Sequence, residues 1–502
     1  MPTYYFSTSG SDANDGLTIN TPKQTIAAFN ALKLSVTDYV VFRGGDTFTG
    51  AMVIPASGSV LSDIIIGSYG IGRATIAPTN ANTDGIKAVN KSFITINGIN
   101  VTGPGMAGTG TGIYFSRTSA GTSQQISIKN IDVTLCGAAG IQIGGDATGA
   151  GFTSCTVEDF VSASNRGEGL SIYGWEAGVR INSYITIQNG TVHDNGDDGA
   201  FIGSCDTGLI YNCTAYSNGA LSNSGPVGFW TYDSDDVIIR SCISYNNTSS
   251  DTADGGGFDI DGNCTGCIIE YCYAYGNKGA GFLLYNYAGA GVWDNNSVRF
   301  CIGENNCTNT VYGELHIGTN PDAGAMTNVH AYGNTFFNNR GSSNSVVVVT
   351  DASITGNIVN NIFYGYGVTN LASVTGNSVL TFAGNNWFAS SFSITWNSVA
   401  YTAASSGTGV LAYAAWQTAT GQEKISGANV GFCVDPMLNY PGRGAAASYK
   451  LQPGSPMLAA GVDLAALFGL NVGPRDYFGS AIVAGSTTIG AGGPNSTATV
   501  TF

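Results

Sequence analysis

Two aspartates, Asp259 and Asp261, are the residues whose type and spacing most directly permit chemistry. They lie two positions apart in a segment that reads as a β-strand, so both side chains leave one face, with Cα atoms roughly 6.5–7 Å apart. Cleavage of a glycosidic bond by the inverting route needs two carboxyl groups ~6.5–9.5 Å apart. Glu314, expected two strands along and roughly 9.5 Å away, is the third candidate. We therefore expect Asp259, Asp261 and Glu314 to be catalytic.

Aromatic and polar side chains flank these carboxylates in the predicted strands. Ring faces of Trp and Tyr stack on sugar rings, and polar side chains hydrogen-bond to sugar hydroxyls. An imidazole could also position substrate or relay a proton. The residues expected to bind substrate are Trp230, Tyr232, Asp233, Tyr285, His316, Tyr173 and Asp198.

A repeat of about 29 residues must position these side chains. A short strand follows a glycine in each repeat. Counted from that glycine, the residues at +1 and +3 are apolar and should point inward, so those at +2 and +4 point outward. The glycines are Gly169, Gly199, Gly228, Gly257 and Gly281. The first expected outward file is Ser171, Phe201, Trp230, Asp259, Leu283 and Glu314. The second is Tyr173, Gly203, Tyr232, Asp261, Tyr285 and His316. Glu314 and His316 fit these two files only if their strand is shifted by one residue relative to the others.

A column of cysteines supports the same repeat. Cys213, Cys242, Cys272 and Cys301 are separated by 29, 30 and 29 residues, inside segments of alternating apolar residues. Side chains at equal phase in successive coils stack at ~4.8 Å, so we expect these thiols to fill the interior of an all-β parallel β-helix. Cys264 and Cys267 have the spacing of metal ligands, but no second Cys or His pair accompanies them.

Asparagine recurs where the second strand of each repeat ends, because it tolerates the left-handed backbone of a corner. The positions are Asn195, Asn218, Asn246, Asn277 and Asn305.

The two ends of the chain differ from its repetitive middle, and solenoids need caps. We expect an entry strand and capping helix within residues 1–70, with the helix over Thr21–Leu34. The β-helix is expected over 71–399, and C-terminal coils and an irregular cap over 400–502.

Composition excludes several classes of function. The 502 residues include 18 Lys and Arg against 33 Asp and Glu, a net charge of −15 that disfavours binding to nucleic acid. No apolar run approaches ~18 residues, so no membrane span is expected. The first residues lack the basic and apolar regions of a signal peptide. We expect a location outside the cell or at its surface, or a virion tail if the chain is phage-encoded.

Both ends of the chain resemble right-handed parallel β-helix carbohydrate-active proteins of the pectin-lyase-like superfamily. The N-terminal YYFSTSGSDANDGLTINTPKQTI, GGDTFTGAMVI and IIIGSYG are similar to their entry module, and FCVDPML, YKLQPGSPMLAAG, GPRDYFGS and TTIGAG to their closing module. The group contains glycoside hydrolases, polysaccharide lyases and phage tailspike depolymerases. Residues 195–203 and 254–261 echo the aspartate motifs of polygalacturonases, but the histidine and Arg-x-Lys signatures are absent.

Three functions therefore remain open. The first is a glycoside hydrolase acting on a neutral or weakly charged glycan without a cofactor. The second is a lyase on a uronate polymer, in which the aspartates could hold Ca²⁺, although neither central outward file contains Lys or Arg. The third is a non-catalytic adhesin or phage receptor-binding protein. The aspartates could also form a plain solvated face. We expect a monomer, or a homotrimer for a tailspike.

Overall fold

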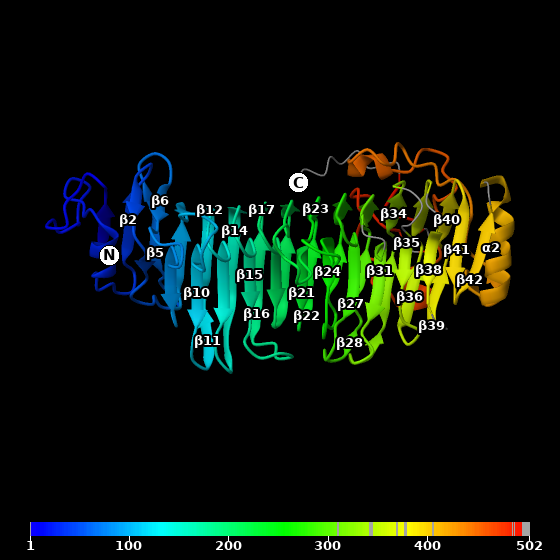
Figure 1. The fold of residues 1–502 in the computed structure, drawn as a ribbon, viewed down its shortest axis with the longest axis horizontal. Helices are drawn as coiled ribbons and strands as arrows, with labels where there is room; N and C mark the ends of the chain where they lie inside the picture. Colours follow the sequence, from blue (N-terminus) through cyan, green and yellow to red (C-terminus); the bar gives the residue numbers. More distant parts are fainter. Residues whose placement is uncertain are drawn as a thin grey trace. The chain divides into compact units, whose positions relative to one another are not determined.

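The computed structural model describes residues 2–308, 311–340, 345–367, 370–375, 379–403, 406–483, 485 and 487–493. The chain folds as an all-β parallel β-helix, as predicted (Figure 1). Residue contacts divide it into two compact units. The first unit comprises Met1–Pro226, Asp233–Val237 and Ser249–Asp251, and the second comprises Val227–Tyr232, Ile238–Thr248 and Thr252–Phe502. The last residues of the predicted C-terminal cap, 494–502, lie outside the described part of the chain.

Each coil of the first unit contributes one strand to one face and usually two strands to the remaining wall. The first set is β4 (Met52–Val53), β7 (Ile86–Val89), β10 (Ile113–Arg117), β13 (Ile141–Gly145), β15 (Leu170–Tyr173) and β18 (Ala200–Gly203). The wall strands are β1 (Thr3–Phe6), β2 (Tyr39–Arg43), β3 (Thr47–Thr49), β5 (Ile64–Tyr69), β6 (Ala74–Ala77), β8 (Ile94–Asn97), β9 (Ile99–Thr102), β11 (Gly121–Gln124), β12 (Ile126–Thr134), β14 (Ala150–Ala163), β16 (Asn182–Gln188), β17 (Thr191–His193), β19 (Cys205–Tyr211) and β20 (Thr214–Tyr216). β22 (Asp235–Arg240) has residues in both units.

The second unit repeats this plan. Its site-bearing face, which is the one that matters below, is β21 (Val227–Tyr232), β24 (Gly256–Ile260), β27 (Phe282–Asn286), β31 (Gly313–Thr319), β35 (Ser345–Val349), β38 (Asn370–Val374), β41 (Phe392–Trp396) and the antiparallel β42 (Val399–Ala403). The wall is β23 (Ile243–Tyr245), β25 (Ile268–Glu270), β26 (Tyr273–Tyr275), β29 (Ser297–Arg299), β30 (Ile302–Glu304), β33 (Val329–Tyr332), β34 (Thr335–Asn338), β36 (Thr355–Val359), β37 (Ile362–Gly365), β39 (Val379–Ala383) and β40 (Asn386–Ala389). Two short pairs complete it: β28 (Trp293–Asp294) with β32 (Met326–Thr327), and β43 (Lys424–Ile425) with β44 (Ala428–Asn429).

Identical or similar side chains stack inside each unit, because parallel pairing in register places equal phases over one another. In the second unit the Phe258 ring lies 6.0 Å from Phe229 and 5.3 Å from Phe282, ring centre to ring centre. The predicted burial of the cysteines is confirmed: Cys213 in the first unit and Cys242, Cys272 and Cys301 in the second are all buried and free. The amide N–H of Cys272 donates to the sulfur of Cys301 at 3.4 Å.

The corner asparagines have two roles. Some adopt the left-handed backbone that the sequence predicted, and others form hydrogen-bonded ladders that it did not predict. Asn246 and Asn305 have the expected left-handed backbone, with φ of 53° at both. Asn195, Asn218 and Asn277 instead belong to ladders of buried amides, in which one asparagine donates its N–H and its Nδ2 to the Oδ1 of the next. The ladders are Asn165, Asn195 and Asn218 in the first unit, and Asn247, Asn277 and Asn306 followed by Asn334, Asn361 and Asn385 in the second. These bonds satisfy backbone donors that the corners would otherwise leave unpaired.

The N-terminal cap is a shorter helix than predicted. α1 spans Ile26–Asn30, and Thr25 is its N-cap, accepting the amide N–H of Ala28 at 3.1 Å. Phe29 turns inward onto Phe6 and Phe42, with ring centres 6.1 and 5.8 Å apart. The helix therefore covers the first coils with one aromatic side chain.

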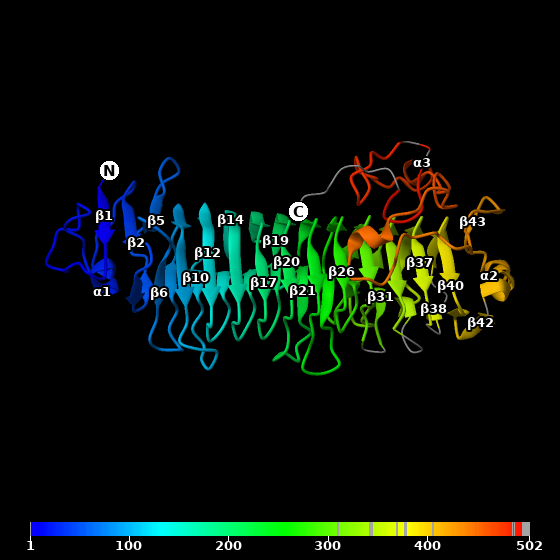
Figure 2. The same ribbon diagram turned by 90° about the horizontal axis from the view of Figure 1, so that it is seen from above.

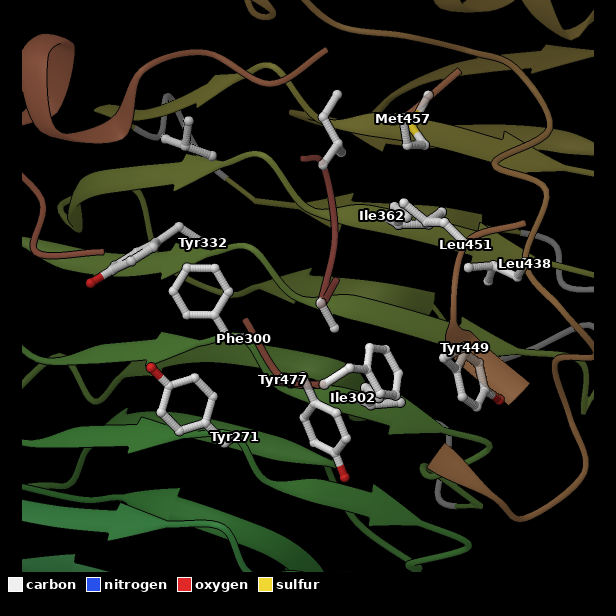
Figure 3. Packing of buried hydrophobic residues seen from close by; sticks show 14 of the residues in the cluster. Tyr271, Phe300, Ile302, Tyr332, Ile362, Leu438, Tyr449, Leu451, Met457 and Tyr477 are labelled. Carbon is white, nitrogen blue, oxygen red and sulfur yellow. The ribbon is translucent and has the colours of Figure 1, made fainter. Parts of the chain in front are cut away.

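The second unit ends in a longer helix and a returning arm. α2 (Ser406–Thr420) places Trp416 against Trp387 and Trp396, with ring centres 5.3 and 5.7 Å apart. The arm, residues 421–493, contains a short 3₁₀ helix (Ala446–Tyr449) and α3 (Leu464–Phe468), and runs back along the wall strands from β40 towards β26 (Figure 2). Its apolar residues bury the outer side chains of those strands, as Tyr449, Leu451 and Met457 do near Ile302 and Ile362 (Figure 3).

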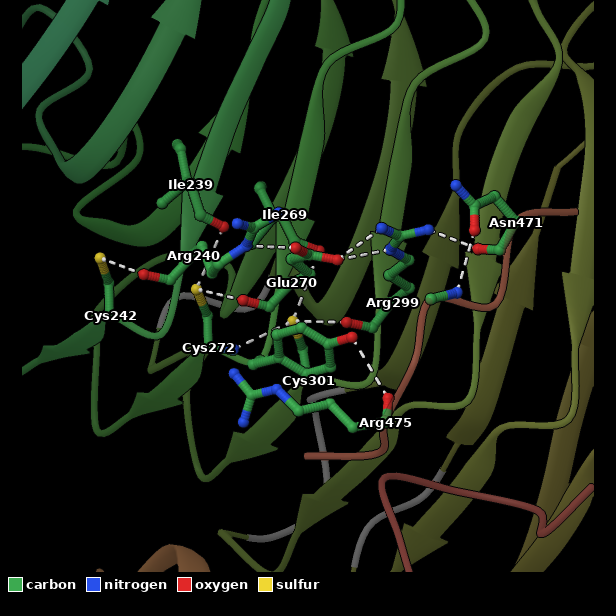
Figure 4. A network of polar contacts seen from close by, with 12 residues as sticks. Ile239, Arg240, Cys242, Ile269, Glu270, Cys272, Arg299, Cys301, Asn471 and Arg475 are labelled. Atoms are coloured by element: carbon green, nitrogen blue, oxygen red, sulfur yellow. Dashed lines mark hydrogen bonds and ion pairs between the residues drawn. The ribbon is translucent and has the colours of Figure 1, made fainter. Parts of the chain in front are cut away.

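A buried ion pair anchors the arm to the wall (Figure 4). Arg299 donates its Nε to Glu270 at 2.7 Å, and both side chains are almost fully buried. The Arg299 guanidinium also donates to the carbonyl oxygen of Asn471, which accepts the hydroxyl of Tyr332 at 2.7 Å as well. The Arg475 guanidinium lies over the Tyr271 ring, 4.4 Å from its centre.

Candidate active site in the second unit

A pocket of about 430 Å³ opens on β24, β27 and β31 of the second unit. Four of the predicted site residues line it: Asp259, Asp261, Tyr285 and His316. The remaining lining residues are Asp254, Leu283, Val311, Tyr312 and Thr350. The structure therefore brings the predicted pair of aspartates together with an aromatic ring and an imidazole.

The two aspartates differ in their surroundings. Asp259 lies on β24 and is 3% exposed, paired with Trp230 on one side and Leu283 on the other. Asp261 follows the strand and is half-buried; its Oδ1 accepts the amide N–H of Gly262 at 2.8 Å. The backbone N–H of Asp261 donates to the carbonyl of Thr231 at 2.9 Å, which continues the parallel pairing beyond the strand end. The strand thus presents two carboxyl groups to one pocket, one deep and one near the surface.

Within the second unit the outward file is confirmed from Trp230 through Asp259 to Leu283 and is wrong after it. β27 and β31 pair Phe282 with Leu315 and Leu283 with His316, so His316, and not Glu314, continues the file of Asp259. Tyr285 pairs with Gly318, where the sequence predicted His316. The strand is shifted by two residues relative to the prediction.

Glu314 is consequently not on the exposed face. Its side chain is fully buried, and its carboxylate accepts the N–H and Nδ2 of Asn306 and the Nδ2 of Asn338 at 2.6–2.8 Å. Burial is the largest influence and raises the pKa of this carboxyl group to about 8. A substrate in the pocket cannot reach this side chain, so the expectation of a surface catalytic carboxylate is wrong for Glu314.

In the preceding coils, a glycine occupies the position that corresponds to Glu314. A Cβ added to Gly169, Gly228, Gly257 or Gly281 would lie 2.7–2.9 Å from the Nδ2 atom of the ladder asparagine beside it. Glu314 fits because its carboxylate takes the place of the next amide in the ladder and accepts from Asn306. At these four positions only glycine leaves room for the amide of the neighbouring ladder asparagine.

His316, Tyr312 and Asp254 form one wall of the pocket. Asp254 accepts the Tyr312 hydroxyl on Oδ1 at 2.6 Å, and its backbone N–H donates to the same hydroxyl oxygen at 3.0 Å. The Tyr312 ring centre lies 5.1 Å from that of His316. His316 is 5% exposed, and burial lowers its pKa to about 4, so the imidazole is neutral near pH 7.

The opposite side of the site is aromatic. Trp230 and Tyr232 on β21 stack on each other with ring centres 5.1 Å apart, and both are half-buried. The rings of Trp230, Tyr232 and Tyr285 offer faces on which a sugar could stack.

The hydroxyl group of Tyr285 has a raised pKa. Burial is the largest cause, followed by the charges of Asp261, Asp254 and Asp259.

Three predicted substrate-binding residues belong to the first unit. Tyr173 donates its hydroxyl to Asp146 at 2.7 Å. Asp233 is 2% exposed, and its Oδ2 accepts the amide N–H of Gly178 at 2.8 Å. Asp198 is 7% exposed. Their roles in binding stay predictions.

Asp254 and Tyr312 are the site residues that sequence reasoning missed. Asp254 stood in the noted motif 254–261, but five positions before Asp259 it falls outside the strand alternation. Its backbone is left-handed, with φ of 42°, which turns the chain into β24. Tyr312 lies in the connection before β31, where the repeat carries no phase information.

No group of three or more His, Cys, Asp or Glu side chains with the geometry of a metal site occurs among the described residues. Cys264 and Cys267 are both buried and free. None of the described helices has the length and apolar character needed to cross a membrane.

A family model described as the right handed beta helix region matches residues 111–302. The fold is a right-handed parallel β-helix. A search of the curated proteins found no match.

Solved structures share this fold at low sequence identity. The mannuronan C-5 epimerase AlgE6 A-module of Azotobacter vinelandii is 16% identical, with a TM-score of 0.53 over 72% of this chain and 92% of that one. The GH136 lacto-N-biosidase of Eubacterium ramulus is 16% identical, with a TM-score of 0.49 over 64% of each chain, so this chain spans less than two thirds of that enzyme. The pectate lyase Pel9A is 16% identical, with a TM-score of 0.44 over 98% of this chain and 96% of that one.

Proposed function

We propose that this protein is a glycoside hydrolase whose active site is the pocket around Asp259 and Asp261. The observation that carries the proposal is the placement of these two carboxyl groups, two residues apart, in one pocket with Tyr285 and His316. Hydrolysis of a glycosidic bond needs one carboxyl group to protonate the leaving oxygen and a second to activate water or attack the sugar. The stacked pair Trp230 and Tyr232, next to Asp259, supports binding of a sugar ring.

The surroundings of the two carboxyl groups favour a division of roles. Asp259 is the deeper group, and burial disfavours a charged carboxylate, so we assign it the role of general acid. Asp261 accepts a backbone N–H and is half-buried, so it can stay ionised as the base for water. Neutral His316 supplies a hydrogen bond to a substrate hydroxyl.

The decisive experiment measures reducing ends released from a panel of plant, algal and bacterial polysaccharides, with the unsaturated-sugar absorbance recorded in parallel. Hydrolysis produces reducing ends without that absorbance, and elimination produces both. The proposal fails if every glycan that binds is left uncut, or if cleavage survives unchanged when Asp259 and Asp261 are both replaced by Asn.

A polysaccharide lyase acting on a uronate polymer is the second candidate. The contact between the Tyr312 and His316 rings favours it, since proton abstraction beside a carboxylate needs a base and a proton donor. The composition of the pocket opposes it, because no Lys or Arg is among the described lining residues. Calcium held by the aspartates would have to supply the positive charge, and chelator sensitivity would test this.

The third candidate is a non-catalytic glycan-binding adhesin or a phage receptor-binding protein. The same aromatic and acidic pocket would then bind a glycan without cutting it. Light scattering contributes to this choice, because a homotrimer favours a tailspike and a monomer favours a secreted enzyme. A location outside the cell is part of the proposal in each case.

A further inference from the structure

His316 is a polar residue at an apolar position of the site-bearing face. It lies on β31 and pairs with Leu283 of β27 on one side and with Val348 of β35 on the other, and all three side chains are buried. The imidazole is 5% exposed, and its Nδ1 has no hydrogen-bond partner in the described part of the chain. A buried polar atom without a partner lowers stability, and a leucine at this position would avoid that cost. Packing therefore does not account for a histidine here, whereas contact with a ligand would.

The imidazole also lines the pocket of the candidate site. Its ring centre lies 5.1 Å from that of Tyr312, whose hydroxyl donates to Oδ1 of Asp254 at 2.6 Å. Burial lowers the pKa of His316 to about 4, so near pH 7 one ring nitrogen donates a hydrogen bond and the other accepts one. A sugar hydroxyl both donates and accepts, so it can pair with either form of the neutral ring. A hydroxyl group is therefore the ligand group that this side chain suits.

Leu283 separates His316 from Asp259 in the same file of side chains. Asp259 pairs with Leu283, and Leu283 pairs with His316, so the Cα atoms of Asp259 and His316 are two strand spacings, roughly 9.5 Å, apart. All three residues line the pocket. A sugar ring placed over the apolar side chain of Leu283 has one edge at Asp259 and the opposite edge at His316. Polar groups at both ends of an apolar floor fix the orientation of a small ligand.

The proposed function gives this orientation a direction. As general acid, Asp259 protonates the oxygen bonded to the anomeric carbon of the sugar. In a pyranose ring the carbon opposite the anomeric carbon is carbon 4, so the hydroxyl on carbon 4 is the group that extends towards His316.

We infer that His316 recognises the 4-hydroxyl of the sugar ring whose anomeric carbon lies at Asp259, so that the site distinguishes sugars that differ only at carbon 4. The inference rests on the proposed function, because it names the specificity of the same site. It also restricts the substrate: the 4-hydroxyl of this ring must not be linked to a further sugar. A polymer linked through carbon 4 would therefore be cut only at its non-reducing end.

Sugars that differ only at carbon 4 test this directly. We would measure binding of glucose and galactose, N-acetylglucosamine and N-acetylgalactosamine, and mannose and talose to the full chain by ligand-observed NMR at about pH 7. Both members of a pair share one 4-deoxy analogue, which lacks the hydroxyl altogether. In the pair that binds, we expect the two epimers to differ at least about 3-fold in Kd, and the 4-deoxy sugar to bind ~2–10-fold more weakly than the better epimer, the usual effect of one hydrogen bond. Equal binding of the 4-deoxy sugar, or no binding by any pair, would overturn the inference.

Variants of His316 assign the effect to this side chain. His316→Leu removes the hydrogen bond and keeps the position filled, so the epimers and the 4-deoxy sugar should bind within about 2-fold of one another. Its Tm should equal or exceed that of the wild type, because no polar atom is left buried and unpaired. His316→Gln retains a donor and an acceptor and should keep part of the preference.

His330 provides the matched control. It is a second buried histidine of the same unit, on β33 of the wall, and it is not among the described lining residues of the pocket. His330→Leu should leave the preference at carbon 4 unchanged. A folded His316→Leu protein that still distinguishes the epimers as the wild type does would overturn the inference.

The outcomes also separate this inference from the proposed function. Cleavage that depends on Asp259 but is indifferent to the 4-hydroxyl would leave the hydrolase standing and remove the role of His316. Binding that depends on His316 and on the 4-hydroxyl, without cleavage of any glycan, would do the opposite.

Discussion

Glu314 accepts hydrogen bonds from both nitrogen atoms of Asn306, at 2.8 Å from the backbone N–H and at 2.6 Å from Nδ2. Glu423 holds the two nitrogen atoms of Asn385 in the same way, at 3.0 and 2.8 Å. Each asparagine ladder of the second unit therefore ends on a buried carboxyl group. The two glutamates do for the ladders what the next asparagine does in the preceding coils.

The first prediction concerns the pH dependence of stability. Burial raises the pKa of Glu314 to about 8 and that of Glu423 to about 7. Because these folded-state values exceed the ordinary value of 4.5, the stabilising contribution is complete below pH 4.5 and is lost as pH rises towards 8. For Glu314 the full loss is on the order of 3–5 kcal/mol of the free energy of unfolding. Urea unfolding between pH 5 and 8 measures it.

Two variants of Glu314 control this prediction. Glu314→Gln cannot titrate, so its unfolding free energy should change less with pH than that of the wild type. Glu314→Ala leaves the Asn306 donors buried and unpaired, which costs about 1–3 kcal/mol per group at every pH. An identical pH slope in wild type and Glu314→Gln would contradict the assignment of the slope to this residue.

The second prediction concerns catalysis. Asp259→Asn and Asp261→Asn should each lower kcat by ~10²–10⁴-fold, the usual contribution of general acid–base catalysis. Thermal unfolding should show that both variants fold. Asp206→Asn provides a matched change of charge away from the pocket and should keep full activity. Full activity of both site variants would remove these aspartates from the mechanism.

The third prediction concerns the aromatic platform. Trp230→Ala should raise KM more than it lowers kcat, because a stacking surface supports substrate and transition state alike. Trp175, which is 63% exposed in the first unit, offers a matched replacement. Initial rates over a range of substrate concentrations for both variants give the comparison. A larger rise in KM for Trp175→Ala would place the binding surface elsewhere.

The fourth prediction concerns the histidines. Burial lowers the pKa of His316 and His330 to about 4. Since the folded state favours their neutral forms, their contribution to stability is complete above pH 6.5 and is lost as pH falls towards 4. NMR of protein carrying isotope-labelled histidine should show two imidazole signals that titrate below pH 5. Titration of the His316 signal near pH 6.5 would show that the pocket is wetter than the structure indicates.

The fifth prediction concerns the thiols. Of the 11 cysteines, ten are buried and Cys433 is partly exposed. Burial raises the pKa of Cys433 to about 11, so little thiolate is present at pH 8. A thiol reagent should therefore label at most one cysteine slowly in the native protein and all 11 after unfolding. Rapid labelling of several thiols in the native state would contradict the cysteine column.

The repeat allowed much of the fold to be predicted, because every coil repeats the same phase. The burial of Cys213, Cys242, Cys272 and Cys301 follows from spacing alone, and so does the placement of Asp259 beside Trp230. The error at Glu314 has a physical origin. The connections before β24, β27 and β31 differ in length, and alternation within a strand cannot show which residue resumes the phase after such a connection.

Contacts made between loops could not be predicted. The bond from Tyr312 to Asp254 joins residues 58 positions apart, and neither lies at a repeated phase. Asp259 is 3% exposed, and the pocket beside it is also lined by residues of the connections before β24 and β31, which the strand pattern does not describe. The sequence therefore predicts which strand bears the two carboxyl groups. It does not predict the loop residues that enclose them in a pocket.

The docking of Arg299 onto Asn471 has a consequence for synthesis of the chain on the ribosome. Arg299 emerges 172 residues before its partner, and Tyr271 emerges 204 residues before the Arg475 carbonyl that it binds. Throughout that interval the aromatic outer surface of β26, β29 and β30 has no cover from the arm. At ~5–20 residues per second the exposure lasts on the order of ten seconds or more. During synthesis the outer surface of β26, β29 and β30 is therefore open to aggregation, whereas in the finished protein the arm covers it.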